Sequence, residues 1–179
     1  AVSAETLFRK HYFYYSSKIQ TLVTHCAAFA QDVFDRFLQG KPDAAVFEIG
    51  CNDGVMLKPF AALGVPTVVG MDPASNVVAS AQQDRFTIID DFFNRDTAAR
   101  VRQQYGQFDA ITTSYSFAHI DDMQSVMDGV DALLKPDGVF VFEVYYLGTL
   151  MEEMQYDMIY HEHMCYYSLS ALRNFFARY

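Results

Sequence analysis

The stretch "AAVFEIGCNDG", residues 44–54, decides the fold of this chain. An apolar run leads to an acidic residue, Glu48, and glycines follow at Gly50 and Gly54. Apolar runs without polar alternation are typical of strands that are covered on both faces of a parallel sheet. Glycine permits a tight turn at position 50 and a close approach of the next helix at position 54. We therefore expect a buried strand, a turn and a helix here.

The same unit recurs along the chain. Strands are expected at 44–50, 67–72, 86–90, 108–115 and 139–144, and helices at 55–63, 73–82, 94–105 and 122–134. Short apolar strands separated by helices predict an α/β fold, a doubly wound, mostly parallel Rossmann-like sheet with helices on both faces. The expected core is Val46, Phe47, Ile49, Val68, Val69, Ile88, Ile111, Val139, Val141 and Phe142. Such sheets bind ligands at the carboxyl ends of their strands, so functional residues should follow each strand.

The region before the first strand has a different pattern. Apolar residues at gaps of three and four between 17 and 38 predict a long amphipathic helix, which Gly40 and Pro42 end. We expect a single domain over 1–179, with an N-terminal helical segment at 1–42 and the Rossmann-like core at 43–179. Because the chain begins without Met and stops inside a helical pattern, we also expect a fragment or excised domain of a larger protein.

Composition excludes several classes of function. The net charge is −9 and no Lys/Arg cluster is present, which disfavours nucleic acid and anionic membrane surfaces as partners. No apolar run reaches the roughly 18 residues of a membrane span. The three cysteines form no C-x-x-C pair, so neither a disulfide framework nor a Cys-rich zinc site is indicated, and a cytoplasmic location is expected. With 16 Phe and 12 Tyr, some aromatic rings are expected to line a cleft.

The turn after the first strand predicts a nucleoside-containing ligand. Residues 50–55 read G-C-N-D-G-V, so Asn52 occupies the place of the second glycine of a dinucleotide-binding G-x-G-x-x-G pattern. The carboxylates of Glu48 and Asp53 would repel a pyrophosphate and attract a cationic ligand. The turn resembles motif I of class I S-adenosylmethionine-dependent methyltransferases, which implies that the Gly50 backbone runs close to the methionine part of the cofactor.

Polar residues follow the next strands as well. Asp72 ends the second strand, where an acid accepts hydrogen bonds from both ribose hydroxyls or caps the helix that begins with Pro73. After the third strand, "DDFF" (90–93) offers an acid and an aromatic ring for adenine, although core packing is the favoured interpretation for Phe93. After the fourth strand, "SYSFAHI" would place Ser114, Ser116 and His119 near the transferred methyl group.

The segment "YHEHMCYY" (160–167) concentrates titratable groups after the fifth strand. In an extended segment, His161 and His163 would share one face, and Tyr160 and Glu162 the other. Acid–base chemistry is the favoured hypothesis, because His suits proton transfer near neutral pH. A metal site, with His119 or a carboxylate as a further ligand, and purely structural polar packing are the alternatives.

These motifs together resemble the sugar C-methyltransferase family. "YDMIYHEHMCYYSLSAL" is similar to its "HEH…Y-x-S-L" segment, "YFYYSS" (12–17) to its Y-x-Y-x-S-S motif, and "EIGCNDG", "GMDPASN", "FAHI" and "VFEVYYL" follow in the same order. The resemblance implies a class I methyltransferase fold and S-adenosyl-L-methionine as cofactor. The implied reaction is C-methylation next to a ketone through an enolate, on a nucleotide-linked keto-deoxysugar or a similar small acceptor.

The resemblance also implies roles for individual residues. His163 is the expected base, Tyr160 and Glu162 orient the base or the substrate, and His119 stabilises the enolate oxygen. The residues expected to hold the cofactor are Tyr14, Ser16, Glu48, Gly50, Asn52, Asp53, Gly54, Asp72, Asp91, Phe92 and Ser114. No metal is expected, and neighbouring domains of a larger chain are expected partners. The alternative functions are a non-catalytic cofactor-binding module and a metal-dependent enzyme that uses His161 and His163.

Overall fold

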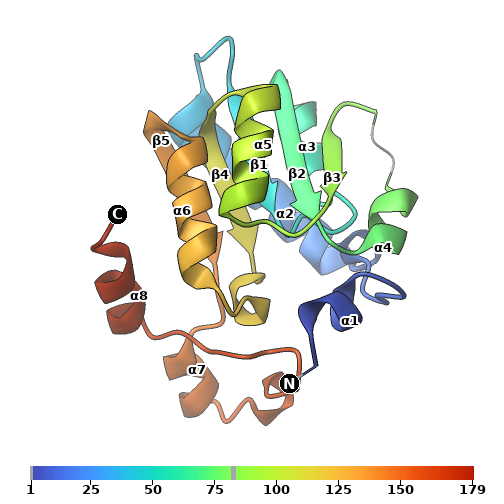
Figure 1. Cartoon of the computed structure of the whole chain (residues 1–179), viewed down its shortest axis with the longest axis vertical. Helices are drawn as coiled ribbons and strands as arrows, with labels where there is room; N and C mark the ends of the chain where they lie inside the picture. Colours follow the sequence, from blue (N-terminus) through green and yellow to red (C-terminus); the bar gives the residue numbers. More distant parts are fainter. Residues whose placement is uncertain (1, 82–83) are drawn as a thin grey trace.

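The computed structural model describes residues 2–81 and 84–179 and is built on a five-stranded sheet (Figure 1). The strands are β1 (Ala45–Ile49), β2 (Thr67–Asp72), β3 (Thr87–Asp90), β4 (Phe108–Ser114) and β5 (Leu134–Glu143). They lie in the order β3-β2-β1-β4-β5, and all four neighbouring pairs are parallel. The predicted doubly wound sheet is therefore confirmed, and its strand order reverses beside β1, where α/β sheets bind ligands.

Helices cover both faces of the sheet (Figure 1). One layer contains α2 (Gln20–Val33), α3 (Leu57–Ala62) and α4 (Ser75–Ser80), and the other contains α5 (Arg95–Tyr105) and α6 (Met123–Leu133). Alternate residues of β1 divide between two hydrophobic clusters: Val46 packs with α2 and α3, and Phe47 packs with α5 and α6. This division explains why the strand is apolar without alternation.

Seven of the ten predicted core residues are buried, and the other three belong to β5. The buried residues are Val46, Phe47, Ile49, Val68, Val69, Ile88 and Ile111. Val139, Val141 and Phe142 are only partly buried, because β5 is one of the two edge strands and pairs with β4 alone within the described residues. The strand expected at 139–144 begins earlier, because the sequence "KPDG" (135–138) also falls within β5, at a break in its register with β4.

The predicted helix at 17–38 begins later than expected. Residues Ser16–Lys18 form a separate 3-10 turn, α2 follows, and a π-helical turn at Phe34–Leu38 continues it. The helix predicted at 73–82 is α4, which starts at Ser75 with Pro73 before it, so proline precedes the first turn instead of opening it. Gln82, the predicted last residue of that helix, lies outside the described residues.

Both ends of the chain lie near the carboxyl ends of the strands (Figure 1). At the N-terminal end, α1 (Ala4–Phe8) is followed by residues 9–15, which have no regular structure. At the C-terminal end, α7 (Leu147–Glu152), a 3-10 turn at Tyr156–Met158 and α8 (Leu169–Phe176) follow β5.

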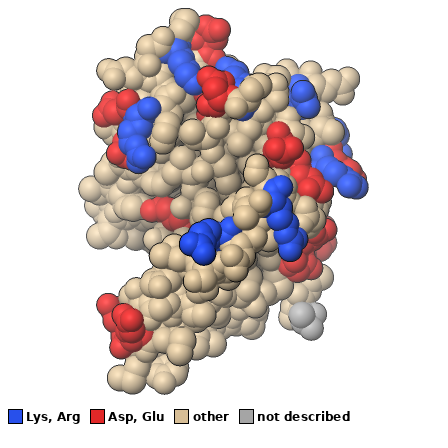
Figure 2. All heavy atoms as spheres, turned by 90° about the vertical axis from the view of Figure 1, so that its left-hand side faces the viewer, with Lys and Arg blue, Asp and Glu red and all other residues tan. Residues whose placement is uncertain are grey.

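The segment 146–169 forms a lobe with few charged side chains (Figure 2). Its exposed apolar residues include Met151, Met154, Tyr156, Ile159 and Leu169. A parallel bridge between Tyr146 and Tyr167 ties its two ends together. In the part of the chain that the structure describes, no helix has the length and apolar character needed to cross a membrane.

Candidate functional site

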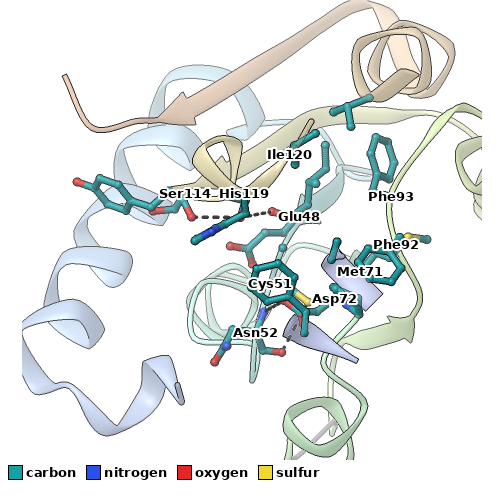
Figure 3. A pocket seen from close by; sticks show the side chains of 18 of the residues that line it. Glu48, Cys51, Asn52, Met71, Asp72, Phe92, Phe93, Ser114, His119 and Ile120 are labelled. Carbon is teal, nitrogen blue, oxygen red and sulfur yellow. Dashed lines mark hydrogen bonds between the residues drawn. The ribbon is translucent and has the colours of Figure 1, made fainter. Parts of the chain in front are cut away.

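A cavity of about 770 Å³ opens at the carboxyl ends of the strands (Figure 3). Its wall is formed by the ends of β1, β2 and β4, the segment after β3, the N-terminal residues up to Ser16, and part of the C-terminal lobe. This is the edge of the sheet at which the sequence predicted the functional residues, and most of the predicted side chains reach it.

The turn after β1 brings the backbone to the cavity. Gly50 has φ +71°, and a Cβ atom built on it would lie 2.1 Å from Oγ of Ser116. Asn52 also has a positive φ, +51°, and its backbone N–H donates to Oδ2 of Asp72 at 2.8 Å. Only glycine fits position 50, because the left-handed conformation and the contact with Ser116 both disfavour a side chain.

Asp72 links the turn after β1 to the turn after β2. One carboxylate oxygen accepts from Asn52 N–H, and the other accepts from Ala74 N–H at 2.9 Å. The side chain therefore stabilises the two backbone turns and still lines the cavity. Burial raises the pKa of Asp72, while these two N–H donors act to lower it.

Glu48 differs from the other acids of the site. It is 3% exposed, lines the cavity, and its Oε2 is buried without a hydrogen-bond partner among the described residues. Figure 3 shows it between Asn52 and Asp72 on one side and Ser114 and His119 on the other. Burial raises the pKa of this carboxyl well above its usual range, and the nearby Asp72, Asp53 and Glu143 raise it further.

The N-terminal strap, residues 9–17, borders the cavity and is held by side chains of the turn after β1 and of α4. Asn52 accepts from Ser16 N–H at 2.9 Å and donates to the carbonyl of Tyr14 at 3.0 Å. Asn76 makes the same pair of bonds with the backbone of Tyr12, at 3.1 and 2.9 Å. These contacts explain how Tyr14 and Ser16, both expected near the cofactor, come to line the cavity.

The aromatic residues after β3 lie in the cavity wall. Phe92 lines it, and the guanidinium of Arg9 lies over the Phe92 ring at 5.4 Å from the centroid. Phe93, interpreted from the sequence as a core residue, packs against Phe47 at 5.4 Å between centroids and also borders the cavity. Phe93 therefore serves both the core and the cavity wall.

Four predicted site residues do not line the cavity, and each has another contact. Asp53 accepts from Ser17 Oγ at 2.6 Å, which anchors the end of the strap. A Cβ at Gly54 would lie 2.7 Å from the Phe86 ring, so this glycine makes room for Phe86 instead of a helix.

The other two are acids. Asp91 pairs with Arg100 at 2.5 Å and with Arg9 at 3.6 Å, so its carboxylate is turned to the basic residues around it. The backbone carbonyl of Glu162 lies 2.9 Å from Nδ1 of His119, and its carboxylate, although outside the cavity wall, acts to raise the pKa of Tyr160 and of His163. The sequence predicted both acids near the site, but it could not show that their carboxylates lie outside the cavity wall.

Two further titratable side chains, Tyr160 and His163, line the cavity wall near His119. Nδ1 of His163 lies 3.0 Å from the Met158 carbonyl, so this nitrogen carries the proton, and Nε2 accepts from the hydroxyl of Tyr160 at 2.8 Å. His119 lies beside His163, with 5.0 Å between ring centroids. Burial lowers the pKa of His163, and the proximity of His119 lowers it further against the raising effect of the Met158 carbonyl.

The predicted alternation in "YHEH" is wrong because this segment turns. His163 N–H donates to the Tyr160 carbonyl at 3.0 Å, which brings Tyr160 and His163 to the same side. His161 points into solvent, with 71% of its side chain exposed, whereas His163 is buried. Among the described residues, no three His, Cys, Asp or Glu side chains gather as metal ligands.

Some cavity residues were not predicted from the sequence. Phe8 of α1 packs edge-on against His119 at 5.3 Å between centroids, and Tyr145 lies 5.1 Å from His163. Glu143, just outside the wall, accepts from Ser114 Oγ and pairs with His25, both at 2.6 Å. The position of Glu143 at the end of β5 was the available signal, since acids also end the first three strands.

Comparisons with known proteins agree with this geometry. The family model described as "Methyltransferase domain" matches residues 22–179. The chain is 35% identical to C-methyltransferase NovU of Streptomyces niveus over 93% of its own length and 39% of that protein. It is 32% identical to a ubiquinone biosynthesis O-methyltransferase of Actinobacillus pleuropneumoniae over 54% of its own length and 44% of the relative. The chain thus spans less than half the length of these two relatives.

A solved structure shares the fold. Magnesium protoporphyrin IX methyltransferase (ChlM) from Synechocystis PCC 6803, with bound SAH, superposes with a TM-score of 0.63 at 15% identity. The match covers 87% of this chain and 71% of that one. At this identity the similarity concerns the arrangement of the sheet and helices alone.

Proposed function

This chain belongs to the methyltransferase domain family, and from that premise we propose that it transfers the methyl group of S-adenosylmethionine to a carbon atom next to a ketone. The observation that carries the proposal is the Tyr160–His163 hydrogen bond in the wall of the cavity at the strand ends. A paired phenol and imidazole can accept a proton from such a carbon, and a methyl donor consumes the carbanion that results.

The residues around the cavity fit this cofactor. Gly50 lines the cavity with its backbone, and Asp72 presents an acid at the end of β2. The buried Oε2 of Glu48 has no hydrogen-bond partner among the described residues, and a cationic group of the cofactor would be a suitable one. We assign cofactor binding to the cavity residues Tyr14, Ser16, Glu48, Gly50, Asn52, Asp72, Phe92 and Ser114. When bound, S-adenosylmethionine supplies an electrophilic methyl group on a positively charged sulfur.

Proton removal is assigned to His163 acting through Tyr160. Because Nδ1 of His163 faces the Met158 carbonyl, Nε2 keeps its lone pair and accepts the Tyr160 hydroxyl. The Tyr160 oxygen takes the proton from the acceptor carbon while its own proton passes to Nε2 of His163. The C–H electron pair stays on the carbon as an enolate, and the proton ends on His163. The lowered pKa of His163 favours the neutral imidazole that this transfer requires.

His119 is assigned to the enolate oxygen. Its Nδ1 donates to the Glu162 carbonyl, and its ring lines the cavity. In the imidazolium form, Nε2 also carries a proton and can donate to a developing negative charge. The two histidines thus have different proposed roles: His163 takes up the proton, and His119 donates a hydrogen bond to the enolate oxygen.

The choice of carbon as the methylated atom rests on two observations. The similarity to the C-methyltransferase covers 93% of this chain, whereas the similarity to the O-methyltransferase covers 54%. A base placed beside a second proton donor also suits enolate formation better than methylation of an acidic phenol. The finer proposal, supported by the "HEH" resemblance, is a nucleotide-linked keto-deoxysugar as acceptor and a role in sugar biosynthesis.

The test is hydrogen exchange at the acceptor carbon. A nucleotide-linked 4-keto-deoxysugar deuterated at carbon 3 is incubated with the protein and S-adenosylmethionine, and both loss of deuterium and methyl transfer are measured. His163→Ala and Tyr160→Phe should slow both processes by about 10²–10⁴-fold, the usual contribution of general-base catalysis. His161→Ala is the matched control, because this neighbouring imidazole is in solvent, and it should leave both rates unchanged.

The other outcomes separate the alternatives. Methyl transfer without loss of deuterium would indicate O-methylation. Cofactor binding without turnover would indicate a non-catalytic cofactor-binding module. Activity that a chelator abolishes and His161→Ala reduces would favour the metal-dependent enzyme.

A further inference from the structure

Glu48 is a buried acid without the hydrogen bonds that stabilise a buried charge. It is 3% exposed near the end of β1, and Oε2 has no hydrogen-bond partner among the described residues. An ionised carboxylate in such a place is costly unless it is paired, so buried acids without partners take up a proton.

The neighbouring acids do not share this condition. Asp72 accepts two backbone N–H groups, Asp53 accepts Ser17, and Glu143 accepts Ser114 and pairs with His25. Each of the three carboxylates has hydrogen-bond donors, whereas Oε2 of Glu48 has none in the part of the chain that the structure describes.

The groups around Glu48 make its ionisation still less favourable. Asp72 faces Glu48 from β2, Asp53 from the turn after β1 and Glu143 from β5. Burial is the largest cause of the raised pKa of Glu48, and these three acids raise it further. The other titratable groups that interact with it are two thiols, Cys26 of α2 and Cys51 of the turn. His25 could carry a positive charge near this group of acids, but its Nε2 is paired with Glu143.

We propose that Glu48 holds a proton in the cofactor-free protein and releases it when a positively charged group of the cofactor enters the cavity beside it. The inference rests on the proposed function, because it takes S-adenosylmethionine as the ligand. Cofactor binding and the loss of one proton to the solvent are then a single coupled equilibrium, and Glu48 selects a cationic ligand over a neutral one.

S-adenosylmethionine carries two cationic groups, an ammonium and a sulfonium, and its demethylated product, S-adenosylhomocysteine, keeps only the ammonium. If the sulfonium faces Glu48, methyl transfer removes the charge that holds Glu48 ionised, and the carboxyl regains its proton as the product leaves. If the ammonium faces Glu48, both ligands release the proton. Comparing the two ligands identifies the group.

The experiment is titration calorimetry at pH 7 in phosphate and in Tris, two buffers with different heats of ionisation. The difference between the apparent binding enthalpies in these buffers gives the number of protons released. We expect about one proton for S-adenosylmethionine with the parent protein and almost none with Glu48→Gln, which has the same shape and no charge to gain. Glu152→Gln, an exposed glutamate in α7, is the control and should release the same number as the parent.

Each result has a distinct meaning. Binding with equal enthalpies in both buffers, or equal proton release from Glu48→Gln and the parent, overturns the inference and leaves the cofactor assignment standing. Absence of binding contradicts the proposed function instead. The neutral state of Glu48 is then tested in the protein alone.

That second test compares the unfolding of the cofactor-free parent and Glu48→Gln from pH 5 to pH 9. Because the folded pKa of Glu48 is raised above its unfolded value, the parent loses stability as pH rises between the two values. Its unfolding equilibrium constant should increase relative to that of Glu48→Gln by up to about tenfold per pH unit. Parallel curves for the two proteins would show that Glu48 is not neutral at rest.

Discussion

Gly50 shows how one residue in the first turn constrains both the backbone and the cavity. Its φ of +71° disfavours any side chain, and a Cβ would overlap Oγ of Ser116 at 2.1 Å. Gly64 has a similar φ, +87°, but nothing lies within 4 Å of its Cβ position. The two glycines therefore separate the conformational effect from the steric one.

We expect Gly50→Ala to lower the free energy of unfolding more than Gly64→Ala does. Both substitutions incur the left-handed penalty of about 1–2 kcal/mol, and Gly50→Ala adds the overlap with Ser116, typically about 1–3 kcal/mol. Urea denaturation measures both variants. Equal losses would show that Ser116 moves aside freely and that the turn does not depend on this contact.

At the scale of elements, the strap (residues 9–17) is attached to three parts of the structure: α4, the turn after β1 and the end of β3. Asn76 in α4 holds its centre with two hydrogen bonds to the backbone of Tyr12, and Asn52 holds its end in the same manner. Arg9 holds its start by pairing with Asp90 at 3.0 Å. Residues 9–15 have no regular structure, so these side chains determine their position.

We expect Asn76→Ala to open the strap without unfolding the domain. The substitution removes three hydrogen bonds, two to the Tyr12 backbone and one to the Tyr15 hydroxyl. At about 0.5–1.5 kcal/mol each, their loss corresponds to at least roughly a tenfold increase in cleavage within the strap during limited proteolysis. Cofactor affinity should fall as well, because Tyr12 and Tyr14 line the cavity. Asn76→Asp, which still accepts Tyr12 N–H, should show a smaller effect. A cleavage rate equal to that of the parent would mean that Asn52 and Arg9 hold the strap without Asn76.

At the scale of the whole molecule, the cavity and a cluster of stabilising polar contacts lie at opposite ends of the sheet. The carboxyl ends of the strands surround the cavity, whereas Asp109, near the start of β4, joins three strands at the amino ends. It accepts from Lys135 of β5 at 2.7 Å, from Ala45 N–H of β1 at 2.9 Å, and from Lys41 at 3.0 Å. Burial acts to raise its pKa, but these donors outweigh burial and lower it.

We expect Asp109→Asn to reduce stability at neutral pH without weakening cofactor binding. The folded pKa of Asp109 lies below the unfolded value, so its contribution is full above the unfolded pKa of 3.8 and disappears as pH falls through the folded pKa. The loss near pH 7 should be about 1.5–3 kcal/mol, and the two proteins should converge in strong acid. Thermal unfolding at several pH values, with calorimetry at pH 7, measures both effects. A loss that persists unchanged in strong acid would show that Asp109 acts through packing instead of charge.

The fold was predictable from the sequence because its determinants are local. Each apolar run identifies a buried strand, and glycines, prolines and acids mark where the strands end, so the parallel sheet and the edge that carries the cavity follow from the pattern. The positions of Glu48, Gly50 and Asp72 at the strand ends follow in the same way. The role of β5 as edge strand did not, because strand order depends on contacts between distant segments.

Only the tertiary structure decided what the individual side chains do at the site. Asp53 is directed to Ser17, and Asp91 is directed to Arg9 and Arg100. The alternation expected in "YHEH" is overridden by the turn that pairs Tyr160 with His163. That Oε2 of Glu48 has no hydrogen-bond partner among the described residues is also a tertiary property, because it depends on the side chains that the surrounding strands and helix place near it. Sequence pattern determines where a strand ends, but the partners of a charged group depend on every element that meets there.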